Sequence, residues 1–441
     1  MTEIIEQEES AKAVLAGLDT PLRESGDIIS DFEHSMAEMK SLVEACDMEV
    51  TATLTQALAH PESATYIGKG KAYELADLIA ETGAEYCVFE GNLSPAQMKN
   101  LQDIVKVPVW DRTNLILEIF SRRAKTREAK LQVESAYLQF MLPRLTGMWQ
   151  HLGRQGGGSG SRSNKGIGET QLELDRRHIN HRIAELSKEL ENISRTRTVQ
   201  RRGRERGRIP SVALVGYTNA GKSSLMNRLL SMSESVSEKN AGDNDKKVFE
   251  KDMLFATLDT SIRHIRPEGY REFLLSDTVG FIENLPHGLV KAFRSTLEET
   301  KYADLLLIVL DSSDPYHKQH RSVTEKTVAE LGAGDIPRIY VMNKSDLTSR
   351  TNEPPMVKDE NVIYISAKTG SGMDKLLDRI SFLLYGNNVE TELLIPFSKG
   401  DVLSRLHESG VVKSEEYTES GTRVCIDCPA NLAQELKQYS C

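Results

Sequence analysis

A glycine-rich loop in the middle of the chain constrains the fold more than any other feature of the sequence. Gly216 and Gly221 enclose four residues, and Lys222 and Ser223 follow directly, which completes a GxxxxGK[ST] phosphate-binding motif. The glycines allow successive backbone N–H groups to point toward phosphate oxygens. In such loops the lysine reaches the β- and γ-phosphates and the hydroxyl binds Mg²⁺. An apolar run precedes the loop and a helix-forming run follows it, so the sequence predicts a strand–loop–helix unit.

Two later segments predict a pocket that selects guanine. Asn343-Lys344-Ser345-Asp346 follows an apolar strand, and the Asp346 carboxylate can accept hydrogen bonds from N1 and N2 of guanine. Adenine offers no matching pair of donors, so it would leave this carboxylate unpaired. Ser366-Ala367-Lys368 follows a second strand, and we expect the Ala367 N–H to meet guanine O6. The expected base contacts are Asn343, Lys344, Asp346, Ser366, Ala367 and Lys368.

Two further segments predict the contacts to Mg²⁺ and the γ-phosphate. In Asp277-Thr278-Val279-Gly280, Asp277 would hold Mg²⁺ through water and Gly280 would bring its N–H to the γ-phosphate. Earlier in the chain, Phe255–Asp259 contains Thr257, the candidate Mg²⁺ ligand of the triphosphate state. The predicted catalytic residues are Lys222, Gly280 and Thr257, and the predicted Mg²⁺ ligands are Ser223, Thr257 and Asp277. The nucleotide contacts expected from the loop and these segments are Gly216, Tyr217, Thr218, Asn219, Ala220, Gly221, Lys222, Ser223, Ser224, Phe255, Ala256, Thr257, Leu258, Asp277, Thr278, Val279 and Gly280.

Two positions in this site predict how it behaves. After Gly280 many small GTPases carry a glutamine that orients the attacking water, whereas this chain has Phe281 and Ile282. Neither side chain can hydrogen-bond water, so we expect slow intrinsic hydrolysis that rises when a partner reshapes the site. Asn219 resembles the loop asparagine of potassium-activated GTPases, in which a monovalent cation takes the place of an arginine finger. Alternatively, Asn219 only tolerates a turn conformation, and the sequence leaves both interpretations open.

Charge is distributed unevenly along the chain. The formal net charge is −10, yet the stretch 144–208 holds fifteen Lys or Arg against seven Asp or Glu. A local basic segment is typical of contact with a phosphate backbone, so nucleic acid is an expected partner. The sequence has no run of eighteen apolar residues, and its first residues are acidic rather than typical of a signal peptide. We therefore expect a cytoplasmic protein without a membrane span.

Composition and periodicity predict an α/β chain of several domains. The regions are an N-terminal α/β domain at 1–117, a helical hairpin with a glycine-rich basic loop at 118–208, a phosphate-loop GTPase domain at 209–386 and a small α+β domain at 387–441. In the first region, strands are predicted at 13–16, 49–54, 86–89 and 107–110, and helices at 28–45, 71–82 and 94–105. Ser94 is the expected cap of the last helix, with Pro95 at its first position. The segment 66–71 is either a strand-to-helix turn or a second nucleotide site.

The hairpin is predicted from apolar residues at helical spacing. A stripe that includes Tyr137 marks the first helix, and the seam of the second is Ile179, Ile183, Leu186, Leu190 and Ile193. Between them, 152–168 is rich in glycine and serine and carries three cations. This loop is either a flexible connector or a segment that orders against a large polyanion, and the surrounding charge favours the second interpretation.

The remaining regions carry fewer signals. The polar stretch 231–252 of the GTPase domain is expected to be disordered. The last region is expected to hold a strand, a helix at 400–408, two strands and a helix at 431–439. Cys425 and Cys428 form a CxxC pair, but the sequence supplies no second pair to complete a zinc site, so we interpret them as thiols.

Taken together, these motifs resemble the HflX family of GTPases over nearly the whole chain. The residues that carry the resemblance are Tyr66–Lys71, Gln155–Gly158, Gly166–Arg177, Gly216–Ser223, Phe255–Asp259 and Asp277–His287. The resemblance implies an N-terminal α/β domain, a helical hairpin, a TRAFAC-type GTPase domain and binding to the large ribosomal subunit and its rRNA. It further implies that the hairpin loop approaches the peptidyl-transferase region and that the GTP-bound protein splits stalled or idle ribosomes. The chain departs from the family at Ile167, where many members have proline, and at 259–263, where Asp-Thr-Ser-Ile-Arg replaces Asp-Pro-Thr-Thr-Arg.

Several functions remain open at this point. The first is a GTP-hydrolysing ribosome-splitting factor that is cytoplasmic, partly ribosome-associated and monomeric. A large-subunit assembly GTPase is its closest alternative. A signalling GTPase that acts on protein partners would not need the basic hairpin to contact RNA. An ATP-dependent RNA remodeller would use the N-terminal region through Lys69 and Lys71.

Overall fold

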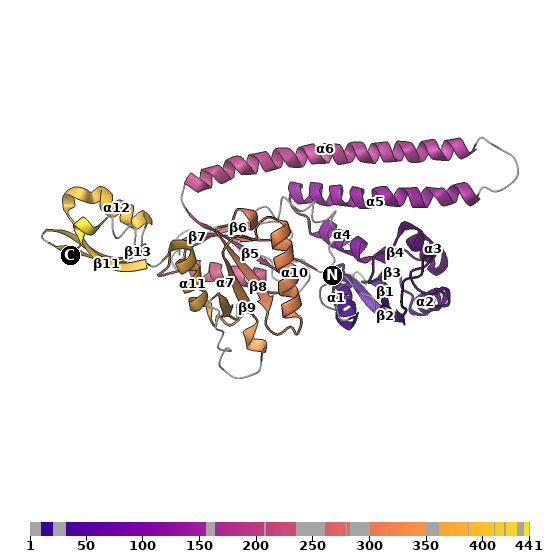
Figure 1. Cartoon of the computed structure of the whole chain (residues 1–441), viewed down its shortest axis with the longest axis horizontal. Coiled ribbons are helices and arrows are strands. Elements are labelled where there is room, and N and C mark those ends of the chain that lie inside the picture. Colours follow the sequence, from indigo (N-terminus) through magenta and orange to yellow (C-terminus); the bar gives the residue numbers. More distant parts are fainter. Residues whose placement is uncertain are drawn as a thin grey trace, which may run out of the picture. The chain divides into compact units, whose positions relative to one another are not determined.

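Contacts within the computed structural model divide the chain into two compact units (Figure 1). The first comprises Met1–Gln200, Asp252–Asp259 and Asn284–Ser295, and the second comprises Arg201–Lys251, Thr260–Glu283 and Thr296–Cys441. The structure describes residues 10–20, 32–155, 164–206, 209–234, 261–278, 280–282, 300–348, 361–386, 388–409, 411–418, 420–429 and 436–440.

The first unit is built on a parallel sheet with the strand order β2-β1-β3-β4. Its strands are β1 (Ala11–Asp19), β2 (Met48–Ala57), β3 (Tyr86–Phe89) and β4 (Val109–Asp111), and its helices include α1 (Phe32–Ala45), α2 (Lys69–Thr82), α3 (Pro95–Val105) and α4 (Arg112–Arg123). Six consecutive residues of β1, from Ala13 to Leu18, are buried, as expected for a parallel strand covered on both faces. The mixed α/β architecture predicted for this region is confirmed.

Local signals explain where these elements begin. The Ser94 side chain accepts a hydrogen bond from the Gln97 N–H, and the Gln97 side chain accepts one from the Ser94 N–H, so the predicted cap of α3 is confirmed. Pro95 occupies the first position of the helix. β4 starts two residues later than predicted, after Pro108, whose nitrogen has no hydrogen to donate to the ladder.

The glycine-rich segment 66–71 opens α2. Gly68 precedes the first helical residue, and its N–H donates to Gln56 Oε1 at 2.8 Å. Tyr66 adopts the left-handed conformation with φ 65°, and its backbone pairs with that of Glu62. Because the Gly68 N–H is already bonded to Gln56, this geometry favours the strand-to-helix turn over a second phosphate site.

Two long helices, which belong to the first unit up to Gln200, lie side by side (Figure 1). These are α5 (Arg127–Gln155) and α6 (Asn164–Arg206). Leu186 of α6 is fully buried, and the Arg182 guanidinium donates to both carboxylate oxygens of Glu134 on α5 at 2.7 and 3.0 Å. Water and salt screen this exposed ion pair, so apolar contacts such as those of the buried Leu186 contribute more to the pairing.

Two expectations for the hairpin were wrong in detail. Residues 152–155 and 164–168, assigned to the loop, are helical, and 156–163 lie outside the described residues. Glycine costs only about 1 kcal/mol in a helix interior, so a helix stabilised by packing elsewhere can extend through it. Tyr137, assigned to the apolar stripe, is 48% exposed.

The second unit contains a six-stranded sheet with the order β10-β9-β8-β5-β7-β6, in which only the β6–β7 pair is antiparallel. The strands are β5 (Ser211–Gly216), β6 (Ser261–Ile265), β7 (Phe273–Asp277), β8 (Leu305–Asp311), β9 (Arg338–Asn343) and β10 (Val362–Tyr364), and the helices include α7 (Lys222–Glu234), α10 (His317–Glu330) and α11 (Met373–Tyr385). Leu214, Val309 and Leu376 belong to one core between this sheet and its helices. Residues 231–234, expected to be disordered, are the last turn of α7, and the rest of that stretch lies outside the described residues.

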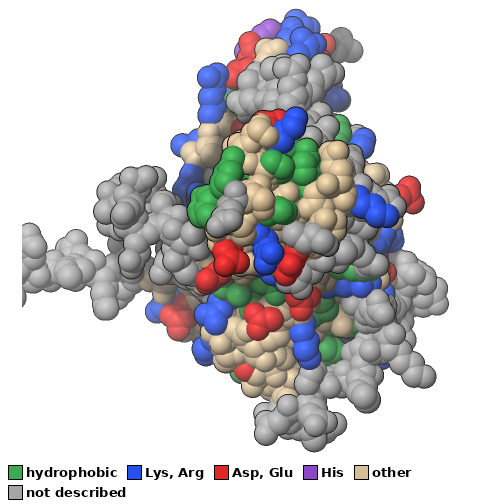
Figure 2. All heavy atoms as spheres, turned by 90° about the vertical axis from the view of Figure 1, so that its left-hand side faces the viewer, with side chains coloured by type: hydrophobic (Ala, Val, Ile, Leu, Met, Phe, Trp, Pro, Cys, Tyr) green, Lys and Arg blue, Asp and Glu red, His purple; other side chains and the backbone are tan. Residues whose placement is uncertain are grey.

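A small antiparallel sheet with the order β11-β13-β12 completes the second unit. Its elements are β11 (Asn388–Ile395), α12 (Gly400–Ser409), β12 (Val411–Thr418) and β13 (Gly421–Pro429). Figure 2 shows apolar and charged side chains intermingled on the side of the molecule that faces the viewer. The described end of the helix expected at 431–439 is a 3-10 turn, Lys437–Tyr439, and 430–435 lie outside the described residues. In the described part of the chain, no helix is apolar over a length that would cross a bilayer.

Candidate functional site

Glycine is required at both ends of the phosphate loop that joins β5 to α7. Gly216 has φ 155°, and a Cβ added there would lie 2.2 Å from the Val309 carbonyl oxygen on β8. Gly221 has φ 89°, and a Cβ there would lie 2.2 Å from Asn343 Nδ2. Any side chain at either position would therefore displace a neighbouring strand end or the base-binding segment. Between them, Asn219 adopts the left-handed conformation with φ 59°.

Lys222 is the first residue of α7, and its side chain extends into this loop. It is 7% exposed, and its ammonium donates to the carbonyl oxygens of Gly216 at 3.1 Å and Tyr217 at 2.8 Å. Burial lowers the pKa of Lys222 to about 8, although the Asp277 carboxylate acts in the opposite direction. A phosphate bound in the loop would favour the charged form, because an adjacent anion offsets the cost of desolvation.

Two of the predicted Mg²⁺ ligands lie side by side. Ser223 is in the first turn of α7 and Asp277 is the last residue of β7, and the Ser223 hydroxyl donates to Asp277 Oδ2 at 3.2 Å. Asp277 is fully buried. A hydroxyl and a carboxylate are the hard oxygen donors that Mg²⁺ prefers, so this donor set fits the ion. The third predicted ligand, Thr257, lies outside the described residues, as do Phe255, Ala256 and Leu258.

The segment after β7 is bonded to the phosphate loop. The Phe281 N–H donates to the Gly216 carbonyl at 3.0 Å, and the Thr218 N–H donates to the Phe281 carbonyl at 2.8 Å. A Cβ added to Gly280 would lie 3.0 Å from Lys222 Nζ, so this glycine permits the close approach. Phe281 is 2% exposed, as is Ile282, and neither presents a polar side-chain group to water. Thr278 donates to the Leu214 carbonyl, and Val279 lies outside the described residues.

The predicted base-binding residues meet at the ends of β9 and β10. Asn343 Nδ2 donates to the Ala220 carbonyl of the phosphate loop at 3.0 Å, and the Ala367 N–H donates to Asn343 Oδ1 at 3.0 Å. The contact expected between the Ala367 N–H and guanine O6 stays a prediction, and in this structure that N–H is bonded to the Asn343 amide. Asp346 is exposed, and its Oδ1 accepts from the Ser366 hydroxyl at 2.6 Å.

The two lysines of these segments differ in their surroundings. Lys344 has φ 59°, and its ammonium lies 2.8 Å from Asp311 Oδ2 at the end of β8. Lys368 is exposed. Lys344 is therefore fixed by a carboxylate from the neighbouring strand, whereas the Lys368 side chain is exposed to solvent.

The sequence did not predict two contacts that hold the phosphate loop and the base-binding segment in place. The Tyr217 ring stacks on the His320 imidazole of α10, with ring centroids 3.8 Å apart and an interplanar angle of 10°. On α7, Arg228 Nη2 donates to the Thr369 carbonyl at 3.1 Å, next to the base-binding segment. Both contacts join residues that are far apart in sequence, so no local spacing could have predicted them.

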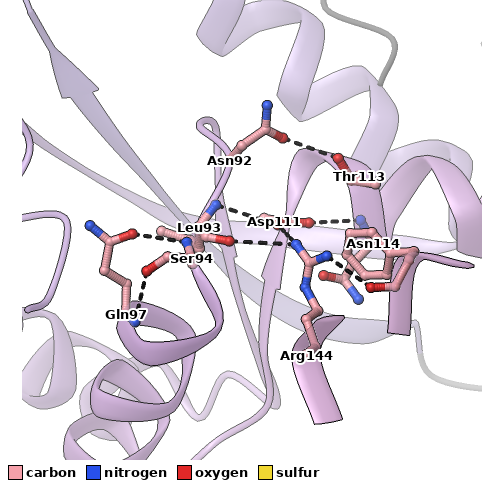
Figure 3. A network of polar contacts seen from close by, with 9 residues as sticks. Asn92, Leu93, Ser94, Gln97, Asp111, Thr113, Asn114 and Arg144 are labelled. Atoms are coloured by element: carbon pink, nitrogen blue, oxygen red, sulfur yellow. Dashed lines mark hydrogen bonds and ion pairs between the residues drawn. The ribbon is translucent and has the colours of Figure 1, made fainter. Parts of the chain in front are cut away.

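A second buried polar network, the α5–β4 network, lies in the first unit where α5 meets the end of β4 (Figure 3). Asp111, the last residue of β4, is fully buried and accepts from the Asn114 N–H at 2.8 Å and from Arg144 Nη2 on α5 at 2.9 Å. The Arg144 guanidinium also lies 3.3 Å from the centre of the Phe140 ring. Burial raises the pKa of Asp111 and lowers that of Arg144, while their mutual attraction opposes both shifts.

This network changes the interpretation of the basic segment. Arg144 and Arg182 were counted among its cations, yet they are paired with Asp111 and Glu134 within the first unit. Arg195 is paired with Glu191 one helical turn away. Part of the positive charge is therefore paired with carboxylates of the protein itself, which makes these arginines less available to a polyanion.

Comparison with known proteins assigns the chain to a family. It is 42% identical over 407 residues to GTPase HflX of Caldanaerobacter subterraneus, covering 92% of this chain and 90% of the relative. The chain belongs to the HflX family of GTPases. It is also 39% identical to the HflX GTPase of Escherichia coli over 88% of each chain. Hydrolysis of GTP is the activity of this family, and the mixed α/β architecture with a phosphate-loop domain agrees with it.

Four family descriptions match successive parts of the chain. They are "GTP-binding GTPase N-terminal" at 33–121, "GTP-binding GTPase Middle Region" at 123–204, "50S ribosome-binding GTPase" at 211–344 and "HflX C-terminal domain" at 355–438. Among solved structures, the chain is 25% identical to a GTP-binding protein from Sulfolobus solfataricus in complex with GDP, with a TM-score of 0.43 and coverage of 84% of this chain and 98% of that chain.

Proposed function

We propose that this HflX-family GTPase binds the large ribosomal subunit through rRNA contacts of its hairpin and splits stalled or idle ribosomes in a GTP-dependent manner. The proposal rests on the combination, in one chain, of a nucleotide site with two long paired helices that carry the basic stretch 144–208. The match of 211–344 to a family described as ribosome-binding supports it. In this proposal the four regions 1–117, 118–208, 209–386 and 387–441 act as domains of a cytoplasmic monomer.

In the proposed mechanism, the phosphate loop and Lys222 bind the β- and γ-phosphates. The backbone N–H groups of 216–223 surround the phosphates, and the Lys222 ammonium exchanges its two carbonyl acceptors for phosphate oxygens. Ser223 and Asp277 would hold Mg²⁺, joined by Thr257. The ion supplies positive charge that neutralises the phosphates when it is bound. Gly280 lies close enough to Lys222 for its N–H to approach the γ-phosphate.

Base selection rests on Asp346, whose exposed carboxylate accepts the two guanine donors. Ser366 fixes that carboxylate, since its hydroxyl donates to Asp346 Oδ1. Lys344 and Lys368 flank the base, and Asn343 links this pocket to the phosphate loop. A nucleotide with adenine would leave the carboxylate without a donor pair in a site shaped to supply one.

Hydrolysis is expected to be slow without a partner. Phe281 and Ile282 are buried and apolar, so no side chain at the usual glutamine position can orient the attacking water. A partner that moves the segment after β7 would change the two backbone bonds that join Phe281 to the phosphate loop. Stimulation by the ribosome would then arise from repositioning of this segment.

The left-handed Asn219 allows two interpretations that one measurement separates. A potassium ion bound at its side chain would add positive charge beside the phosphates, in the role of an arginine finger. A turnover rate that rises when potassium replaces sodium, and does so less in Asn219→Ala, would support Asn219 as a cation ligand. Equal rates in the two salts would leave it with a conformational role only.

The test is GTP hydrolysis with and without purified large ribosomal subunits, at two salt concentrations, for the full chain and a deletion of 155–166. We expect stimulation that weakens at high salt, because contacts to phosphates release counterions, and that is lost in the deletion. An equal rate with and without subunits would contradict the proposal and favour a signalling role. If subunits stimulate hydrolysis but whole ribosomes stay intact in sedimentation, the assembly alternative replaces splitting.

A further inference from the structure

We propose that His320 and Asp314 are positioning residues for the phosphate loop and that they act through Tyr217. Tyr217 follows Gly216 directly, so it is part of the loop that would surround the phosphates. Its ring lies flat against the His320 imidazole, with centroids 3.8 Å apart, and the two residues are 5% and 6% exposed. The inference concerns the nucleotide site of the proposed function, but it does not depend on a ribosomal partner.

The backbone of Tyr217 connects this stack to the catalytic lysine. Its carbonyl accepts the hydrogen bond from Lys222 Nζ at 2.8 Å, and its backbone forms a bridge with Phe281. A rotation of Tyr217 would therefore move an acceptor of the lysine and disturb the bridge to the segment after β7. The aromatic stack opposes such a rotation, because a tyrosine ring can turn only together with its own backbone or by leaving its neighbour.

His320 is in turn fixed from its other side. Its Nδ1 lies 3.1 Å from Asp314 Oδ2, in the turn that leads from β8 to α10. The same aspartate is itself held in place, since its Oδ1 accepts from the Tyr316 N–H at 2.8 Å. The order of contacts runs from the turn at Asp314 to His320, then to Tyr217 and the phosphate loop. A side chain whose neighbours lock its rotamer positions a site more precisely than an isolated one.

The consequence is that a helix without any expected nucleotide contact controls the loop conformation. α10 reaches the phosphate loop through the stack of His320 on Tyr217. Removing the imidazole should leave the loop able to fold but less often in the binding conformation. The affinity for both GDP and GTP then falls, since only the competent fraction of molecules binds.

The test compares His320→Ala, His320→Phe and Val328→Ala in the full chain without ribosomes. Val328 is a fully buried residue of the same helix, so its substitution destabilises α10 without touching Tyr217. We expect His320→Ala to raise the Kd for GDP and the KM for GTP about tenfold while kcat changes less than about twofold. His320→Phe keeps a stacking ring but loses the contact to Asp314, so it should restore both values only in part, to within about threefold of the wild type.

A control on stability decides between positioning and general destabilisation. The melting temperature of each variant is measured alongside the Kd for GDP. If Val328→Ala lowers the melting temperature as much as His320→Ala and leaves the Kd unchanged, the effect is specific to the stack. An unchanged Kd in folded His320→Ala, or an equal rise in Val328→Ala, would overturn the inference. Because GDP binding is measured without ribosomes, a failure here is distinct from a failure of the ribosomal proposal.

Discussion

The nucleotide site and the α5–β4 network both hold charged side chains in buried positions, but they stabilise these charges in different ways. Each places a buried carboxylate at the last residue of a strand, Asp277 of β7 and Asp111 of β4. At the nucleotide site the residues come from short segments in which local spacing matters. In the α5–β4 network, Arg144 pairs with Asp111, which lies 33 positions earlier in the chain. A site built from short segments around a ligand can be recognised as a sequence motif, whereas a pair of residues that joins two distant elements cannot.

The two regions also differ in what the buried cation contacts. Lys222 donates to two backbone carbonyls, which are neutral acceptors, so burial dominates and lowers its pKa. Arg144 faces the carboxylate of Asp111, so each charge offsets the desolvation of the other. The lysine is therefore suited to bind an anion, whereas the arginine already has a carboxylate partner. Substitutions at the nucleotide site should alter function, and substitutions in the α5–β4 network should alter stability.

The largest expected effect is loss of GTP turnover in Lys222→Ala. Removal of the ammonium leaves the transferred phosphate without its closest protein charge, so we expect the rate to fall about a thousandfold or more. Single-turnover hydrolysis measures it, and Lys318→Ala, an exposed lysine of α10, serves as the control. Residual ATP turnover in Lys222→Ala would instead support an RNA remodeller that uses the N-terminal region.

Asp346→Asn should change the base that the site selects. The amide presents a donor where the carboxylate accepted, so KM for GTP should rise about a hundredfold while xanthosine triphosphate, which has an oxygen at position 2, becomes the better substrate. The affinities of the two nucleotides are compared by how well each displaces a fluorescent guanosine diphosphate from the protein. Retention of GTP preference would place the base contact elsewhere than Asp346.

Arg144→Ala tests the other side of the comparison. It leaves the fully buried Asp111 carboxylate without its guanidinium, and breaking a buried pair in this way costs about 3 kcal/mol. Denaturant unfolding of the full chain should show this loss, while the Kd for GDP stays at the wild-type value. The double substitution Asp111→Asn with Arg144→Ala should recover part of the stability, because no unpaired charge remains. A change in GDP affinity would show that the two regions are coupled.

The smallest expected effect is a pH dependence of nucleotide binding. Burial holds the pKa of Lys222 at about 8, and bound phosphate favours its ammonium form, so affinity should fall as pH rises through 8. Between pH 7 and 8.5 the Kd for GDP should rise about fourfold, as the charged fraction of the lysine falls. Lys222→Arg stays charged over this range and provides the control. A slope that persists in Lys222→Arg would assign the titration to another group.

The comparison explains how far sequence reasoning could reach. The phosphate loop, the cap at Ser94 and the strand that ends at Phe89 each follow from residues adjacent in the chain, and each is found where local chemistry requires it. The stack of Tyr217 on His320 and the pair of Asp111 with Arg144 depend on partners that are distant in the chain. Helix ends in the hairpin were misplaced because packing along the seam outweighs the low helix propensity of glycine.

The single amide of Asn343 has a consequence for how the pocket assembles. Its nitrogen is bonded to the phosphate loop and its oxygen to the segment that follows β10, so one planar group serves both halves of the site. Neither half can shift without costing the other a hydrogen bond in a buried environment. Guanosine and pyrophosphate, offered as separate fragments, should therefore each strengthen the binding of the other. The intact nucleotide gains this cooperativity in addition to the entropic advantage of its covalent link.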